Sequence, residues 1–152
     1  MKVAQLLFVI AIAAACGQAT ESPSPAQATP TPEKFGIATL LETACTFEMP
    51  DSLPVHAVTI SLVNKTKYTG HFSFVHIHDG YTFMDLIDYW NSPMGQVQHP
   101  SFITEIRQAD VLANGSRDLV MPVELKGTYA MSCVYADETN KVTGFFHELK
   151  AG

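Results

Sequence analysis

The chain has 152 residues and a formal net charge of −6, with 47% hydrophobic and 16% charged residues. This length corresponds to one domain, and the apolar content suffices for a packed core. Lysines and arginines are scattered singly, whereas a nucleic-acid-binding domain gathers them in a basic patch. We therefore expect no nucleic-acid partner.

The N-terminal segment has the features of an export signal. Residues 1–15 hold one lysine followed by an apolar run that is short for a membrane-spanning helix. The sequence AAACGQ that closes this segment resembles the lipobox of bacterial lipoproteins, which is cleaved before a cysteine that becomes acylated. The resemblance implies a lipoprotein signal peptide at residues 1–15 and lipidation of Cys16. The alternative is a conventional signal peptide with Cys16 left as a free thiol.

The segment that follows is rich in Pro, Ser, Thr, Ala and Gln. Such a composition cannot form a core and favours an extended linker. We expect residues 16–35 to be a lipidated tether and residues 36–152 to be the folded domain. Membrane lipid, contacted through the acyl chains of Cys16, is then a partner, and the domain is extracytoplasmic, at the outer membrane or cell surface.

The first half of the domain alternates apolar and polar residues with period two, which is typical of half-buried strands. This pattern predicts strands at residues 43–49, 56–64 and 71–77. The pair Asp79-Gly80 then marks a turn.

The apolar spacing changes to that of a helix over residues 83–90, where Thr82 and Asp85 are placed to form a capping box. After a loop and a turn signal at Asn114-Gly115, alternation returns and predicts strands at residues 118–125, 128–136 and 142–149. About seven short strands and one helix predict an all-β, Greek-key β-sandwich with one short inserted helix.

Several of these segments resemble the cupredoxins, in particular bacterial cupredoxin-like proteins with a helix inserted after the third strand. The resemblance is carried by FEMPDSL with VTISLVN, by the spacing from Asn64 to His71, by GYTFMDLIDYW and by GTYAMSC. It implies a type 1 copper site made from a thiolate, two imidazoles and a weak axial methionine. It also places Asn64 where the family holds the ligand loop near the sulfur.

The copper ligands themselves match the family only in part. His71 takes the first histidine position and Cys133 the thiolate position. Val142 lies nearest the second histidine position, Phe145 replaces the methionine, and His147 comes two residues late. We expect a cupredoxin-like frame without a resident cofactor; the alternative is copper held by His71, Cys133 and a rearranged His147.

The two remaining cysteines have an explanation of their own. The resemblance places Cys133 on the inward face of its strand, and Cys45 alternates with Phe47. In an oxidising compartment these cysteines can form a disulfide across the sandwich. The alternative is two buried free thiols.

A second group of histidines suggests another metal site. His76 and His78 have the H-x-H spacing found in zinc and copper sites, and His71 and His99 are potential neighbours. The same alternation also places His76 and His78 on the face of Phe72 and Phe74. The alternative is that they mark where this face emerges into solvent, or that they pack against the inserted helix.

The sequence carries no G-x-S-x-G motif and no glycine-rich phosphate loop. We therefore expect no enzyme. The leading hypothesis is a membrane-anchored cell-envelope protein that serves as a non-copper binding or structural module, with its protein or small-ligand partner unidentified. The alternatives are a copper electron-transfer protein and a histidine-based metal-binding protein.

Overall fold

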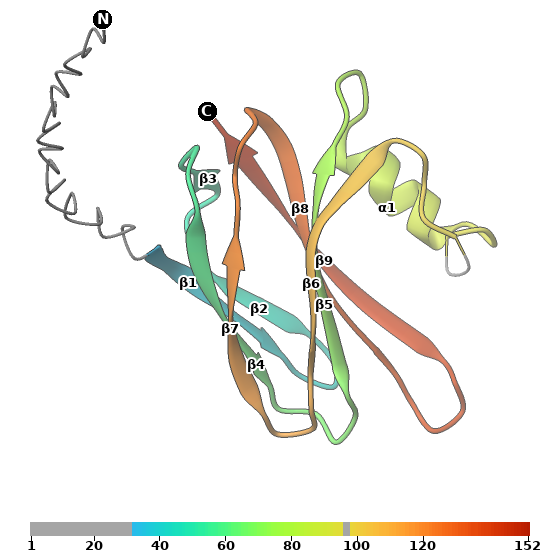
Figure 1. The fold of residues 1–152 in the computed structure, drawn as a ribbon. Coiled ribbons are helices and arrows are strands. Elements are labelled where there is room, and N and C mark those ends of the chain that lie inside the picture. Colours follow the sequence, from blue (N-terminus) through green and yellow to red (C-terminus); the bar gives the residue numbers. More distant parts are fainter. Residues whose placement is uncertain (1–31, 96–97) are drawn as a thin grey trace, which may run out of the picture. The chain divides into compact units, whose positions relative to one another are not determined.

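Two β-sheets form the folded part of the chain, which the computed structural model describes over residues 32–95 and 98–152 (Figure 1). The four-stranded sheet has the order β2 (Cys45–Glu48), β1 (Glu33–Leu40), β4 (Val58–Asn64) and β7 (Ser116–Met121). The five-stranded sheet has the order β3 (Ser52–Leu53), β9 (Val142–Ala151), β8 (Gly127–Ala136), β5 (Gly70–Ile77) and β6 (Ile103–Val111). The helix α1 (Phe83–Asn91) lies between β5 and β6 in the chain.

The chain passes from one sheet to the other after β2, β3, β4, β6 and β7. The pairs β1–β4 and β3–β9 are parallel, and the other neighbouring strands are antiparallel. Crossovers of this kind are typical of Greek-key sandwiches. The predicted all-β sandwich with one inserted helix is therefore confirmed.

The main core lies between the two sheets. Alternate residues of β4 (Val58, Ile60 and Leu62) are fully buried, and so are Phe72 and Phe74 of β5. The period-two pattern that predicted these strands is thus the pattern of side chains that point into the sandwich.

A second, smaller apolar cluster lies on the other face of the five-stranded sheet, beneath α1. Its buried members are Val75 and Ile77 of β5, Leu86 of α1 and Ala130 of β8. Figure 1 shows α1 beside the strands of this sheet. The inserted helix therefore covers part of a sheet face that would otherwise meet solvent.

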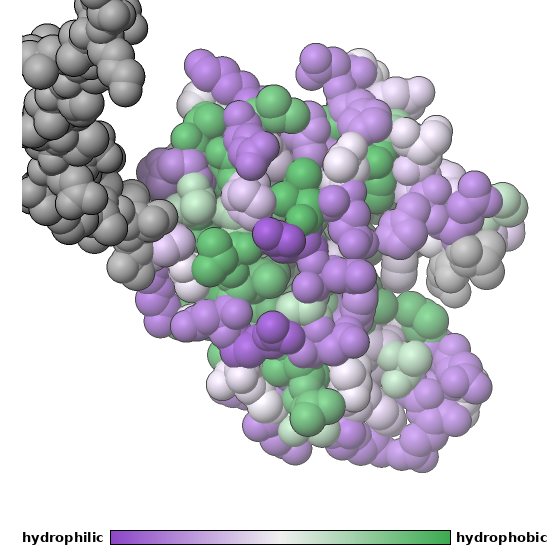
Figure 2. Space-filling view, in the orientation of Figure 1, coloured by the Kyte–Doolittle hydropathy of each residue, from purple (hydrophilic) through white to green (hydrophobic). Residues whose placement is uncertain are grey.

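The surface view in Figure 2 shows apolar side chains interspersed among hydrophilic ones. Large apolar residues with substantial exposure include Met84 of α1, Val120 of β7 and Leu125. Scattered exposed residues of this kind are ordinary for a folded protein.

Two long strands were not predicted from the sequence. β1 begins at Glu33, three residues before the expected domain boundary, and it carries a pairing irregularity between Lys34 and Gly36. β6 is an edge strand in which only Ala109 and Val111 are buried. In both strands the alternation is weak because few side chains enter the core.

Candidate functional site

The two cysteines of the domain are joined to each other. Cys45 of β2 and Cys133 of β8 form a disulfide with a Cα–Cα distance of 6.3 Å. Because β2 and β8 belong to different sheets, the bond links the two layers of the sandwich. The predicted disulfide is confirmed, and the alternative of two free thiols is wrong.

This bond removes the strongest of the expected copper ligands. A type 1 copper site requires a cysteine thiolate. The sulfur of Cys133 is instead bonded to that of Cys45, and Cys133 is fully buried.

His71 lies on the wrong side of the sheet to share a metal with Cys133. In the pairing of β5 with β8, Phe72 is opposite Cys133 and His71 is opposite Val134. Successive residues of a strand point to opposite faces, so Cys133 faces the core while His71 faces outward. The Nδ1 atom of His71 lies 2.6 Å from Oδ1 of Asp110 on β6.

His147 is in β9 and pairs with Met131, which places it on the inner face of the sheet. Its ring stacks on Phe47, with 4.8 Å between ring centroids. Its buried Nε2 lies 3.4 Å from Oδ1 of Asp51 without forming a hydrogen bond. The structure therefore does not bring the expected ligands His71, Cys133 and His147 together.

The second group of histidines is also divided. The ring of His76 packs 4.8 Å from that of Tyr129 and 6.4 Å from that of His78. The Nε2 atom of His78 is 2.8 Å from Oγ1 of Thr104, and His99 lines a separate cavity together with His71. Among the described residues, no group of three His, Cys, Asp or Glu side chains has the arrangement of a metal site. The proposed ligand set His76, His78 and His99 is not assembled, and His76 packs on Tyr129 of the main core.

Asn64 has a structural role at the end of β4. Its side-chain nitrogen, Nδ2, donates to the backbone carbonyls of Tyr68, Val111 and Leu112, at 2.7, 2.9 and 3.2 Å. Its Oδ1 accepts from the amide and the hydroxyl of Thr66. The expectation that Asn64 holds a ligand loop near the sulfur is corrected, because these bonds join the loop after β4 to the end of β6.

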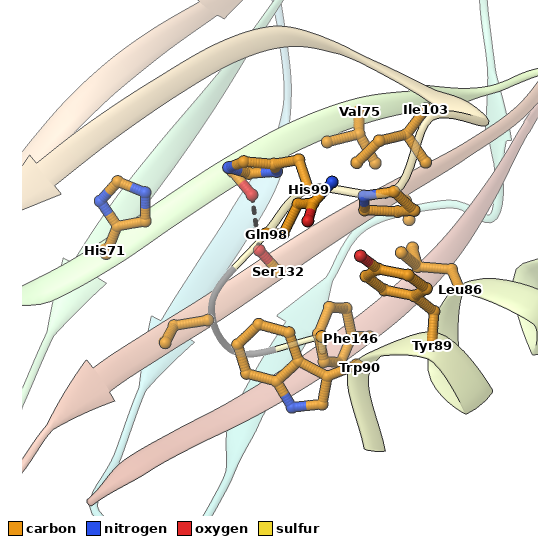
Figure 3. Close-up of a pocket in the computed structure, with 15 residues that line it drawn as sticks. His71, Val75, Leu86, Tyr89, Trp90, Gln98, His99, Ile103, Ser132 and Phe146 are labelled. Atoms are coloured by element: carbon orange, nitrogen blue, oxygen red, sulfur yellow. Dashed lines mark hydrogen bonds between the residues drawn. The ribbon is translucent and has the colours of Figure 1, made fainter. Parts of the chain in front are cut away.

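The outer face of the five-stranded sheet carries a cavity of about 260 Å³ next to α1 (Figure 3). Its floor is formed by outward-facing residues of β5, β8 and β9, and α1 contributes Leu86, Tyr89 and Trp90. In Figure 3 His71 lies at the end away from Leu86 and Tyr89, and Ser132 lies between them. The cavity thus has one apolar and one more polar end.

A pair of serine hydroxyls lies in the floor of the cavity. Ser73 and Ser132 are directly opposite in the β5–β8 pairing, and their Oγ atoms are 2.7 Å apart. Each hydroxyl can donate one hydrogen bond and accept two. The pair therefore keeps one donor and several acceptor positions after its internal bond is made.

Trp90 forms the wall of the cavity nearest β9. Its indole makes an edge contact with Phe146, with 5.1 Å between ring centroids. A Cβ atom at Gly144 would lie only 2.7 Å from the indole, so the lack of a side chain there lets Trp90 approach the strand. A glycine inside a strand is a sequence signal for such a close approach.

The start of α1 is fixed by the predicted capping box. The hydroxyl of Thr82 accepts from the Asp85 amide, and the Asp85 carboxylate accepts from the Thr82 amide at 2.7 Å. Hydrogen bonds from the Thr82 hydroxyl and amide hold the pKa of Asp85 below its usual value. The helix that covers the cavity is thus secured at its N-terminus.

Elsewhere in the core, Tyr129 donates a hydrogen bond from its hydroxyl to the carbonyl of Leu125, at 2.8 Å. Burial raises the pKa of this hydroxyl above its usual value. A neutral phenol that packs against Phe74 and His76 is a structural element of the sandwich.

Comparison with known proteins gives similarity in fold. No protein-family model matches the sequence, and no curated protein matches it significantly. Reduced auracyanin from the photosynthetic bacterium Roseiflexus castenholzii aligns with a TM-score of 0.47 and 12% identity, over 76% of this chain and 94% of that one. Auracyanin A, a "blue" copper protein from the bacterium Chloroflexus aurantiacus, aligns with a TM-score of 0.46 and 14% identity, over 76% and 96%.

A multi-copper oxidase from Pediococcus acidilactici aligns with a TM-score of 0.41 and 11% identity, over 87% of this chain and 28% of that one. The β-sandwich fold of the chain is shown directly by its two sheets and their connections.

The segments expected at the N-terminus, with the signal peptide and Cys16, lie outside the described residues. Within residues 32–95 and 98–152 the chain forms no helix that is long and apolar enough to cross a membrane.

Proposed function

We propose that this protein is a lipid-anchored module of the cell envelope that uses a cupredoxin-like sandwich for binding or structural support, without a type 1 copper ion. The disulfide between Cys45 and Cys133 carries the proposal, because it occupies the sulfur that the metal would need. The outward position of His71 supports the proposal further, because His71 and the sulfur of Cys133 lie on opposite faces of the sheet and cannot share one metal ion.

The side chains of Cys133, His71 and His147 differ from the donors that a type 1 copper ion requires. Cu(II) in a type 1 site needs a thiolate and two imidazoles around one point. Here the sulfur is oxidised, one imidazole faces outward and the other is stacked on Phe47. These residues therefore do not fit the ion.

The experiment adds Cu(II) to the purified full chain and records the visible absorption spectrum. We expect no intense thiolate-to-copper charge-transfer band, and the same spectrum from a Cys133→Ser variant. A strong band that Cys133→Ser abolishes would overturn the proposal and favour copper electron transfer. Stoichiometric copper or zinc that His76→Ala with His78→Ala removes would favour the histidine-based metal site instead.

The membrane anchor is tested separately. The sequence AAACGQ and the proline-rich segment after it support an acylated Cys16 that holds the domain outside the cytoplasm. The full chain is expected in the membrane fraction with acyl chains detected by mass spectrometry. A Cys16→Ser variant that remains in the membrane to the same extent would contradict the anchor.

A further inference from the structure

We propose that the cavity between α1 and the five-stranded sheet binds a small, uncharged aromatic alcohol or phenol, with its ring against Trp90 and its hydroxyl on Ser73 and Ser132. This inference goes beyond the proposed function, because it rests on the outer face of the sheet and not on the disulfide.

The size of the cavity sets the size of the ligand. Drug-sized molecules occupy pockets of about 300–1,000 Å³, and an apolar cavity of about 150 Å³ admits benzene. A cavity of about 260 Å³ is therefore suited to a molecule of one or two rings.

The aromatic walls set its shape. Trp90 and Tyr89 of α1 and Phe146 of β9 line the cavity, and Trp90 and Phe146 already meet edge to face. Aromatic rings gain from offset and edge contacts with other rings beyond the area that they bury. A planar ring fits this lining better than a flexible aliphatic chain does.

The charge of the lining argues for a neutral ligand. Among the described residues that line the cavity, none is Asp, Glu, Lys or Arg. A buried ion without a partner carries a large desolvation penalty. His71 lies at the rim, where its Nδ1 atom is already engaged by Oδ1 of Asp110.

The serine hydroxyls in the floor of the cavity indicate which polar group the ligand carries. The Ser73–Ser132 pair has the apolar residues Val75 and Ala130 next to it on one side, and His71 with Val134 on the other. A single hydroxyl on the ligand can donate to one serine oxygen and accept from the free serine hydrogen. The serine pair therefore suits a ligand with one hydroxyl group at an edge of its ring.

The test uses two fluorinated probes of nearly equal size, 4-fluorophenol and 4-fluorotoluene, with the full chain in detergent. Saturable broadening of the ¹⁹F NMR signal gives an apparent Kd for each probe. Partition into micelles is common to all protein variants, so the ratio of the two Kd values is compared between variants. Quenching of Trp90, the only tryptophan in the sequence, reports the same event from the protein side.

Replacing both Ser73 and Ser132 with Ala removes both hydroxyls together. No single serine hydroxyl is then left without its hydrogen-bond partner. We expect this change to weaken 4-fluorophenol relative to 4-fluorotoluene by about fivefold, which is the typical contribution of one hydrogen bond. Ser61→Ala is the matched control, because Ser61 is a strand serine of the other sheet bonded to Asp118. It should leave the ratio unchanged.

Val134→Phe fills the cavity from β8 and should abolish binding of both probes. The proposal is overturned if wild type shows no saturable binding, if the double serine variant keeps the wild-type ratio, or if Ser61→Ala lowers that ratio equally. It is also overturned if a folded Val134→Phe variant still binds both probes. None of these results alters the copper experiment, so the two proposals fail independently.

Discussion

Asn64 shows how one side chain can fix the end of a strand. It is 1% exposed and uses both ends of its amide, as a donor to three carbonyls and as an acceptor from Thr66. The sequence placed this residue in the cupredoxin pattern, but the hydrogen-bond partners depend on the approach of β6, which was not predicted.

We predict that Asn64→Ala lowers the free energy of unfolding by about 2–3 kcal/mol, because buried carbonyls lose their donor. Urea unfolding of the full chain measures this change. Ser61→Ala, on the exposed face of the same strand, is the comparison and should change stability by less than about 1 kcal/mol. Equal effects of the two substitutions would contradict a special role for Asn64.

At the scale of single residues, alternation showed that Cys45 shares a face with Phe47 and Cys133 with Met131, and the resemblance to the cupredoxins implied that the face of Cys133 points inward. The predicted metal sites were wrong because they depend on how separate strands pair. Spacing along the chain shows which histidines share a strand, but the face of His71 relative to Cys133 depends on the register between β5 and β8.

Among the elements, α1 depends on its N-terminal capping box. The pKa of Asp85 is lowered by its hydrogen bonds with Thr82, so the ionised carboxylate stabilises the folded helix. This contribution is present above the ordinary aspartate pKa of about 3.9. This stabilisation is lost as the pH falls through the lowered pKa of Asp85 in the folded state.

We therefore predict that α1 loosens in acid, below about pH 4, before the sandwich unfolds. Emission from Trp90 follows the helix, because its indole packs on Phe146. Thr82→Ala should destabilise the helix by about 1 kcal/mol at neutral pH. An acid profile that is the same in wild type and Asp85→Asn would show that another group controls the transition.

The contact between α1 and β9 gives a second prediction at this scale. In Gly144→Ala the new methyl group meets Trp90, and we expect a loss of about 1–3 kcal/mol as the indole moves. In a Trp90→Ala background the same substitution should lower the free energy of unfolding by much less. A double-mutant cycle measures the difference. If the cost is the same in both backgrounds, Trp90 is not its cause.

Alternation predicted β4 and β5, in which buried and partly exposed residues alternate along most of the strand. The strands β8 and β9 were also predicted, although β8 buries residues on both faces and β9 is partly buried along most of its length. The capping box likewise predicted the start of α1. The sequence did not reveal the cavity, since it forms where α1 meets β5, β8 and β9, and the last two of these strands are distant from α1 in the chain. Gly144 within a strand was the available signal for that contact.

For the whole molecule, the disulfide closes a loop between residues 88 positions apart and joins the two sheets. In the chain-entropy description such a cross-link stabilises the folded state by about 4 kcal/mol. We predict that reduction lowers the free energy of unfolding by about this amount. A Cys45→Ala with Cys133→Ala variant should show the same stability with and without reductant, whereas a reductant effect that persists in it would contradict this assignment.

The state of the two sulfurs tests the central claim most directly. The measurement is a titration of free thiols in the denatured full chain carrying Cys16→Ser, with mass analysis of the linked peptides. We expect no free thiol without reductant, a peptide pair joining Cys45 to Cys133, and both thiols after reduction. Two free thiols in the unreduced protein would contradict the account, because Cys133 would then be available to a metal.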